Sequence, residues 1–168
     1  MERPSDTDNI YQGIKLQKTL DSVYEVIKTL VMTNNLQFDL VSPEKKLFSA
    51  PVAMVTLPGT EGDFGVLPGH APFISTMRVG IIDVYETDNT VSRRMLVTGG
   101  IVEVNPESCT VLAEEATPLE DVSVESMGVE HTKLTERLAV AEGDAKDALR
   151  EQVEISEKKL ELLRFLRC

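Results

Sequence analysis

The stretch from Gly59 to Phe73 constrains the fold more than any other part of the sequence, because turn residues and large apolar residues are interleaved in it (GTEGDFGVLPGHAPF). Glycine adopts positive φ at little cost and proline fixes φ at about −65°, so the glycines and prolines of the stretch specify defined turns. A flexible linker would lack the large apolar side chains, which we expect to anchor the stretch in a core: Phe64, Val66, Leu67 and Phe73.

Burial of those side chains leaves four polar residues of the same stretch to face outward: Thr60, Glu61, Asp63 and His70. Two of the four are carboxylic acids, which give the surface an acidic character. The stretch therefore predicts an ordered loop system at one edge of a β-domain, with a polar contact surface.

From Leu36 to Glu115 apolar residues repeat with a period of two, which is typical of strands with one buried face. Turn residues such as Asn105-Pro106 separate the short runs, and no helical pattern intervenes. Short strands at this spacing predict an antiparallel β-sandwich or barrel. Gly99-Gly100 interrupts an apolar run and indicates a bulge or a tight bend.

Pro118 ends the sheet region, and two amphipathic helices are predicted after it. Asp121 or Ser123 can cap the first helix, and Gly143 lies in the turn before the second, which runs from about Ala145 to Leu166. The apolar arc of the second helix covers close to half of its circumference, so the pair should also lie against the sandwich or another subunit. The fold class is α+β, with a β-sandwich over 36–117 and a two-helix hairpin over 118–168.

Residues 1–35 are expected to form an N-terminal extension that is helical or partly disordered. Apolar residues between Ile10 and Val31 follow helical steps of three and four. Three interpretations stay open: a helix that docks on a partner, a helix that packs on this protein's own core, or a segment outside the mature protein with its start at Met32.

The chain carries 28 acidic and 17 basic residues, a net charge of −11, which disfavours nucleic acid and anionic lipid as partners. No apolar run is long enough to span a membrane and no signal-peptide pattern is present, so direct membrane insertion is not expected. The two cysteines, Cys109 and Cys168, make neither a disulfide framework nor a metal site, and Cys109 is expected to be buried and inert.

Few residues are candidates for chemistry. His70 could act with Asp63 or Glu61 as a ligand or an acid–base group, whereas His131 lies on a helix stripe and is expected to pack there. No zinc spacing, phosphate loop or nucleophile elbow occurs, so no catalytic, cofactor-binding or metal-binding residue is predicted. The hairpin carries several basic residues, among them Lys133, Arg137, Lys146 and Arg150. Basic residues of the hairpin have two interpretations: they form salt pairs along the helices, as Glu154 could with Lys158, or they form a face that meets an acidic partner.

The run from Gly62 to Phe73 (GDFGVLPGHAPF) resembles the signature of the epsilon subunit of bacterial F-type ATP synthase, called delta in mitochondria. Further similarity at residues 41–49, 99–104 and 111–113 extends the resemblance over most of the chain from Leu36 to Cys168. The resemblance implies an N-terminal β-sandwich, a C-terminal helical hairpin and a non-catalytic role.

By this resemblance the protein would be a central-stalk subunit, peripheral on the cytoplasmic face of the bacterial inner membrane, that couples proton-driven rotation of the c-ring to ATP synthesis. Thr60, Glu61 and Asp63 would contact the basic loops of the c-ring, and His70 would contact the gamma subunit. The basic residues of the hairpin would reach partner subunits, with the alpha and beta subunits of the head as candidates. No cofactor is implied.

Two questions stay open within the resemblance. In several bacterial relatives the hairpin restrains ATP hydrolysis, and this hairpin has the right position but a weak sequence match. Ser123 and Ser126 stand where the acid and the arginine of ATP-binding relatives belong, so no tight ATP binding is predicted. The alternative function is a stand-alone β-sandwich enzyme that uses Asp63 and His70.

Overall fold

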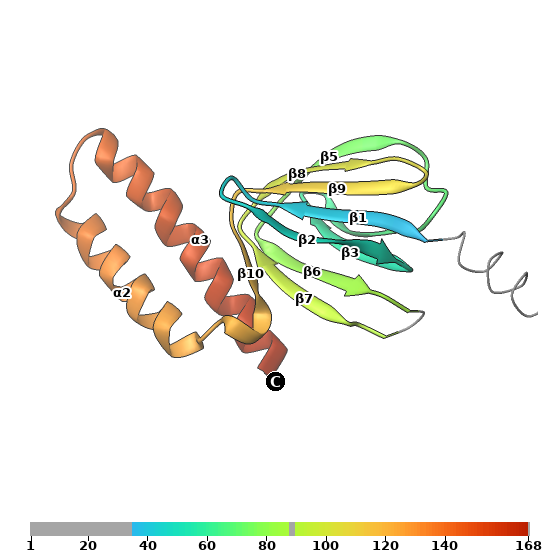
Figure 1. The fold of residues 1–168 in the computed structure, drawn as a ribbon. Helices are drawn as coiled ribbons and strands as arrows, with labels where there is room; N and C mark the ends of the chain where they lie inside the picture. Colours follow the sequence, from blue (N-terminus) through green and yellow to red (C-terminus); the bar gives the residue numbers. More distant parts are fainter. Residues whose placement is uncertain (1–34, 88–89, 168) are drawn as a thin grey trace, which may run out of the picture. The chain divides into compact units, whose positions relative to one another are not determined.

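A computed structural model of the chain describes residues 35–87 and 90–167 (Figure 1). The helix expected between Ile10 and Val31, residues 88–89 and Cys168 lie outside the described residues. The strands are β1 (Leu36–Val41), β2 (Lys46–Val52), β3 (Met54–Gly59), β4 (Gly62–Val66), β5 (Phe73–Met77), β6 (Gly80–Tyr85), β7 (Arg93–Val97), β8 (Gly100–Val104), β9 (Ser108–Ala113) and β10 (Ala116–Pro118). A 3-10 turn, η1 (Leu119–Asp121), leads to α2 (Val124–Val140) and α3 (Asp144–Arg167).

The ten strands form one sheet in the order β10-β7-β6-β3-β5-β8-β9-β1-β2, with β4 paired to β3. The sheet folds over on itself, so that its two halves enclose one core (Figure 1). This confirms the α+β class with an N-terminal β-sandwich. Among the described strands, only β1 and β9 run parallel, with Phe38 opposite Cys109, so the expectation of a wholly antiparallel sheet misses one pair. Parallel neighbours need a long connection, and the intervening strands supply it.

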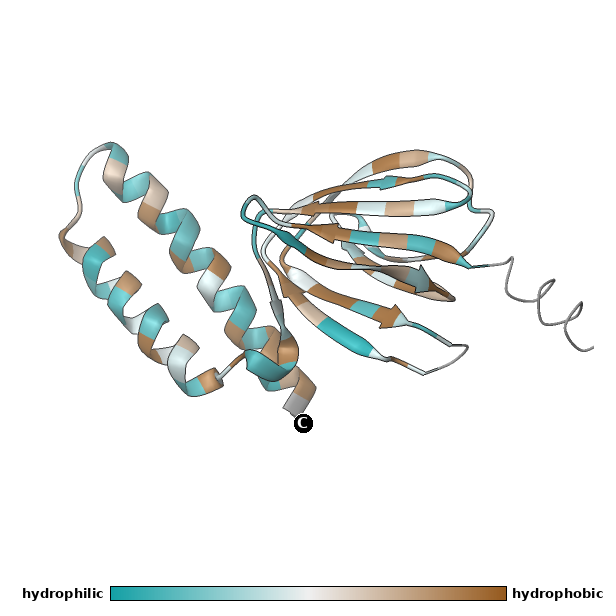
Figure 2. Ribbon diagram, viewed as in Figure 1, coloured by the Kyte–Doolittle hydropathy of each residue, from teal (hydrophilic) through white to brown (hydrophobic). Residues whose placement is uncertain are grey.

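The core comes from the inward members of the alternating runs. Leu36, Phe38 and Leu40 on β1 are fully buried, whereas Gln37 and Asp39 between them are partly exposed. Figure 2 shows the same alternation of hydrophobic and hydrophilic residues along the strands. Successive side chains of a strand point to opposite faces, so the sequence period translates directly into one buried and one exposed face.

Cys109 on β9 is fully buried in this core. Burial raises the pKa of its thiol to about 12. Since the thiolate is the reactive form of cysteine, the thiol is inert at neutral pH, as the sequence indicated.

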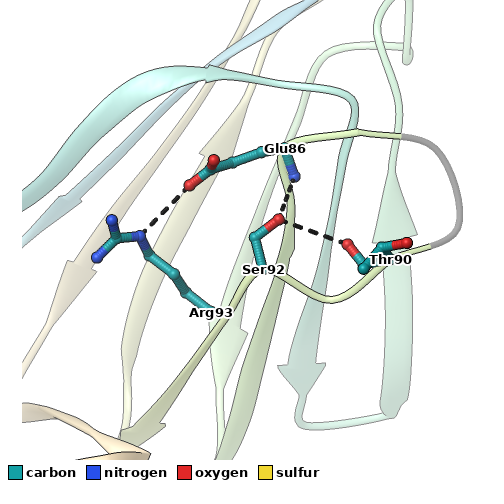
Figure 3. Close-up of polar contacts among 4 residues, drawn as sticks. All are labelled: Glu86, Thr90, Ser92 and Arg93. Atoms are coloured by element: carbon teal, nitrogen blue, oxygen red, sulfur yellow. Dashed lines mark hydrogen bonds and ion pairs between the residues drawn. The ribbon is translucent and has the colours of Figure 1, made fainter.

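The connection between β6 and β7 is held by side chains on either side of residues 88–89 (Figure 3). The Ser92 hydroxyl accepts a hydrogen bond from the Glu86 backbone N–H at 3.1 Å and donates to the Thr90 carbonyl at 3.5 Å. Arg93 pairs with Glu86, with 3.4 Å between Nε and Oε1, and its guanidinium lies 5.4 Å from the ring centroid of Phe48 on β2. Arg93 thus links β7 to β2, the edge strand at the far end of the strand order.

The two C-terminal helices pack against each other. Ser123 caps α2, because its hydroxyl accepts a hydrogen bond from the Ser126 N–H at 3.3 Å. Ser156 continues the stripe that Leu149, Leu160 and Leu163 bury on α3, and its hydroxyl lies 2.7 Å from Nδ1 of His131 on α2. His131 is therefore a packing residue, as expected. No helix in the described part of the chain is long and apolar enough to cross a membrane.

Asp39 supplies a test of how much a surface ion pair on β1 and β2 contributes to stability. Its Oδ1 lies 2.7 Å from Lys46 Nζ and 2.6 Å from the Ser49 hydroxyl, which hold the pKa of the carboxyl below its ordinary value. A lowered pKa stabilises the fold above the unfolded-state pKa of about 4 and stops doing so as the pH falls through the folded-state pKa. We expect Asp39→Asn to lower the free energy of unfolding by about 0.5 kcal/mol at pH 7.

Urea denaturation at pH 7 and pH 3 measures this difference, which should shrink at the lower pH. Glu44 is exposed and forms no ion pair with another described residue, so Glu44→Gln is the matched control and should change little. If Asp39→Asn lowers the free energy of unfolding equally at both pH values, the loss is steric and does not come from the charge.

Candidate functional site

The turn between β3 and β4 is exposed, and its residues 60–63 are called the tip here. Gly59 is paired with Gly62 across the two strands, which leaves Thr60 and Glu61 as the connecting residues. Gly62 has a φ of +135°, a backbone conformation that residues with a Cβ rarely adopt. The predicted turn chemistry of the stretch therefore builds a tight two-residue hairpin.

Three of the four expected anchors of the stretch contact the core. Val66 is fully buried, and the half-buried rings of Phe64 and Phe73 meet edge to face with 5.3 Å between their centroids. The prediction for Leu67 is wrong, since 54% of it is exposed. Val66 ends β4 with its side chain inward, and the next residue points to the opposite side.

The three residues assigned to a ring contact lie together at the tip, and all are exposed. Thr60 is tied to β5, because its hydroxyl oxygen lies 3.3 Å from that of Thr76. Asp63 Oδ1 lies 2.6 Å from Nη2 of Arg78, a partner that the sequence did not reveal. Glu61 forms no ion pair within residues 35–87 and 90–167.

His70 does not face fully outward as expected. It is half-buried, its ring lies 5.1 Å from that of Phe73, and its Nδ1 lies 2.9 Å from the carbonyl oxygen of Ala71. Among the described residues, no hydrogen bond or ion pair joins His70 to Asp63, and no group of three His, Cys, Asp or Glu side chains could hold a metal. The two residues of the enzyme hypothesis therefore have separate partners.

A patch of exposed apolar side chains on β5, β8 and β9 was missed by the sequence analysis. This patch, called here the outer apolar face, consists of Ile74, Ile101 and Leu112, which are 72%, 49% and 55% exposed. Ile101 stands directly opposite Leu112 in the β8–β9 pairing. The sequence signal that could have revealed this patch is an apolar residue at a position where the alternating pattern of a strand places an outward-facing side chain. Exposed apolar side chains gathered in this way are typical of surfaces that contact another molecule.

The basic residues of the hairpin lie on both helices. Lys133 and Arg137 are exposed and four residues apart on α2, and Lys146 and Arg150 have the same spacing on α3. Arg150 pairs with Asp147 at 3.2 Å. The expected pair of Glu154 with Lys158 is present at 2.7 Å, so helical salt pairing is confirmed for this part of α3.

In the part of the chain that the structure describes, an ion pair joins the hairpin to the sandwich. Lys159 Nζ lies 3.0 Å from Oε2 of Glu115, and only 15% of the lysine side chain is exposed. The pair borders a cavity of about 510 Å³ lined by both parts, including Thr98 of the sandwich, Met127 of α2 and Ile155 of α3.

Comparison with known sequences gives a consistent family. Residues 35–119 match the family model of the ATP synthase delta/epsilon chain, beta-sandwich domain. The ATP synthase epsilon chain of Rhodospirillum rubrum is 46% identical over 117 residues, which are 70% of this chain and 87% of that protein. The epsilon chain of Parvibaculum lavamentivorans is 44% identical over 137 residues, 81% of this chain and 98% of that one. A third, from Rhodospirillum centenum, is 62% identical over 90 residues, 53% of this chain and 62% of the relative.

Solved structures show the same fold at lower identity. A chain of the Euglena gracilis mitochondrial ATP synthase, solved as an OSCP/F1/c-ring assembly, superposes with a TM-score of 0.66 at 23% identity, covering 80% of this chain and 82% of that one. A chain of the Tetrahymena thermophila mitochondrial ATP synthase, from a structure of the central stalk and c-ring, superposes with a TM-score of 0.50 at 13% identity. The match covers 79% of this chain and 96% of that one. At these identities the likeness concerns the fold alone.

Proposed function

Because the chain belongs to the delta/epsilon family of ATP synthase subunits, we propose that it is a non-catalytic subunit of the central stalk that couples proton-driven rotation of the c-ring to ATP synthesis. The observation that carries this proposal is the pair of contact surfaces on one rigid sandwich. The exposed acidic tip connects β3 and β4, and the outer apolar face covers β5, β8 and β9. A torque-transmitting part needs such surfaces held at a fixed separation by a packed core.

The tip is the proposed contact with the c-ring. Its exposed carboxylates, Glu61 and Asp63, suit basic groups on the polar loops of the ring, and Thr60 adds a hydroxyl. Charges at such a contact contribute orientation and specificity more than raw affinity.

The gamma subunit is the proposed partner of His70 and of the outer apolar face. The ring of His70 contacts that of Phe73 in a tilted arrangement, and Phe73 precedes Ile74 of that face on β5. Interfaces of long-lived complexes combine apolar and polar side chains, and on this face Glu103 stands opposite Ile74 and Thr76 opposite Ile101 in the strand register. The complex would hold the subunit at the periphery of the bacterial inner membrane, on its cytoplasmic face.

We test the proposal by affinity pull-down of the tagged full-length chain from detergent-solubilised membranes. The gamma subunit and the ring subunit should be recovered together with it. Glu61→Gln combined with Asp63→Asn should reduce recovery of the ring while recovery of gamma is retained. Recovery of the chain alone would contradict the proposal. An activity of the isolated protein that is lost in Asp63→Asn and in His70→Ala would support the alternative enzyme.

We also propose that the hairpin, residues 118–168, acts as a part separate from the sandwich of residues 36–117 and restrains ATP hydrolysis. The junction in the described part of the chain supports this, because beside the Glu115–Lys159 pair the two parts are separated by a cavity that both of them line. Lys133, Arg137, Lys146 and Arg150 would then meet acidic segments of the alpha and beta subunits.

Removal of residues 124–168 should raise the rate of ATP hydrolysis by the assembled enzyme about fivefold, the lower end of common coupling effects between sites. Steady-state hydrolysis by membranes carrying the truncated chain measures this. The control is Lys158→Gln, which removes a lysine paired within α3 and not with the sandwich. A rate equal to that of the full-length chain would remove the restraining role and leave the coupling role intact.

A further inference from the structure

The two carboxylates of the tip have different surroundings. Asp63 is paired with Arg78 at 2.6 Å, whereas Glu61 has no ion-pair partner in the described part of the chain. The charges of Glu61, Asp63 and Arg78 therefore sum to −1, and the unpaired charge is that of Glu61. The two acids of the tip are therefore not equivalent.

Arg78 is itself anchored at the base of the tip. Its backbone N–H donates to the carbonyl of Pro58 at 2.9 Å, and Nη1 donates to the carbonyl of Val79 at 3.0 Å. The following residues, Val79 and Gly80, are buried, and Gly80 lies so close to Pro58 that any side chain there would collide with the proline ring. The segment that carries Arg78 is thus fixed by close packing.

The contacts of Arg78 reach both strands of the tip. Pro58 on β3 is the register partner of Asp63 on β4, so Arg78 binds the two members of one cross-strand pair, one through its backbone and the other through its guanidinium. A second link runs beside it, from the Thr60 N–H to the Thr76 carbonyl at 3.3 Å. Both links fasten the tip to the segment formed by β5 and the residues that follow it.

We propose that Arg78 is a positioning residue for the contact with the c-ring: it braces the β3–β4 tip through Pro58 and Asp63, and by pairing with Asp63 it leaves Glu61 as the charge presented to a basic loop. This inference rests on the proposed function. It assigns different roles to the two acids, since Asp63 orients the tip and Glu61 meets the partner. Preorganised contacts bind more tightly because less conformational freedom is lost on association.

The variant Arg78→Gln separates positioning from charge, because the two models predict opposite signs. Removal of the arginine changes the net charge of the tip from −1 to −2, so a pure charge model predicts tighter binding to a basic loop at low salt. A positioning role predicts weaker binding, by about fivefold, the upper range for an exposed ion pair. The reversed pair, Asp63→Arg with Arg78→Asp, keeps the net charge and should restore binding.

The experiment uses full-length chains assembled in membrane vesicles. Retention of the subunit is measured against rising salt, together with ATP-driven proton pumping. Amide hydrogen exchange of residues 59–63 in the free full-length chain is measured in parallel. Arg78→Gln should weaken retention and accelerate this exchange, whereas Glu61→Gln should weaken retention and leave the exchange unchanged.

Two outcomes distinguish failure of the inference from failure of the proposed function. If Glu61→Gln weakens retention and Arg78→Gln binds as tightly as the native chain or more tightly, the positioning role is overturned and the ring contact stands. If neither variant changes retention, the assignment of the tip to the ring is overturned, even where Arg78→Gln accelerates exchange.

Discussion

Replacing Gly100 with alanine should destabilise the sandwich by about 3 kcal/mol, because two separate costs coincide at this residue. Gly100 has a φ of +137°, which strains any residue with a Cβ. An added Cβ would also collide with the backbone carbonyl oxygen of Leu112 and would lie 2.9 Å from the Cα of Ala113. Gly100 is paired with Ala113 in the β8–β9 ladder, so the obstructing atoms are backbone that cannot rotate away.

Urea denaturation of the full-length chain measures this loss, and two further glycines serve as controls. Gly62 has nearly the same φ, +135°, but open space around it, so Gly62→Ala should show the strain without the collision and lose about 1–2 kcal/mol. Gly65 has ordinary contact distance to Met54 and no positive φ, so Gly65→Ala should be close to neutral. Equal losses for Gly100→Ala and Gly62→Ala would show that β9 yields to the added methyl group.

The same glycine illustrates how much of the fold could be predicted from sequence. Gly99-Gly100 inside an apolar run indicated a bend, and the alternation of Leu36, Phe38 and Leu40 indicated which face of β1 is buried. Such predictions succeed because they depend on neighbours along the chain, whose side chains alternate by geometry. Ser123 as a helix cap is predictable for the same reason, since its hydroxyl bonds to the N–H of Ser126, three residues on.

The features that the sequence did not reveal depend on residues brought together from distant segments. Arg78 pairs with Asp63 fifteen residues away, and Lys159 pairs with Glu115 at a separation of 44 residues. No periodic pattern encodes which strand lies beside which, so neither these pairs nor the parallel contact of β1 with β9 could be inferred. The candidate site at the Gly59–Phe73 stretch was therefore proposed from the sequence, whereas the pairing of one of its two acids, Asp63, with Arg78 required the fold.

A charged residue on the outer apolar face should strongly weaken assembly without unfolding the protein. Ile101 and Leu112 are about half exposed, so Ile101→Asp and Leu112→Asp should each change the free energy of unfolding by no more than about 0.5 kcal/mol. If the face is the buried centre of the gamma contact, each carboxylate would be desolvated there without a partner. We expect each variant to weaken binding by about thirtyfold, which corresponds to about 2 kcal/mol.

Val129→Asp is the matched control, because Val129 on α2 is 56% exposed, almost the same as Leu112, but lies outside the sheet. Calorimetric titration of gamma into each full-length variant, with urea midpoints measured in parallel, separates binding from folding. Ile101 and Leu112 are cross-strand partners, so a single desolvated contact would make their losses less than additive in the double variant. Native affinity in both single variants would instead mean that gamma binds elsewhere, and the exposed apolar side chains would then need a different partner to cover them.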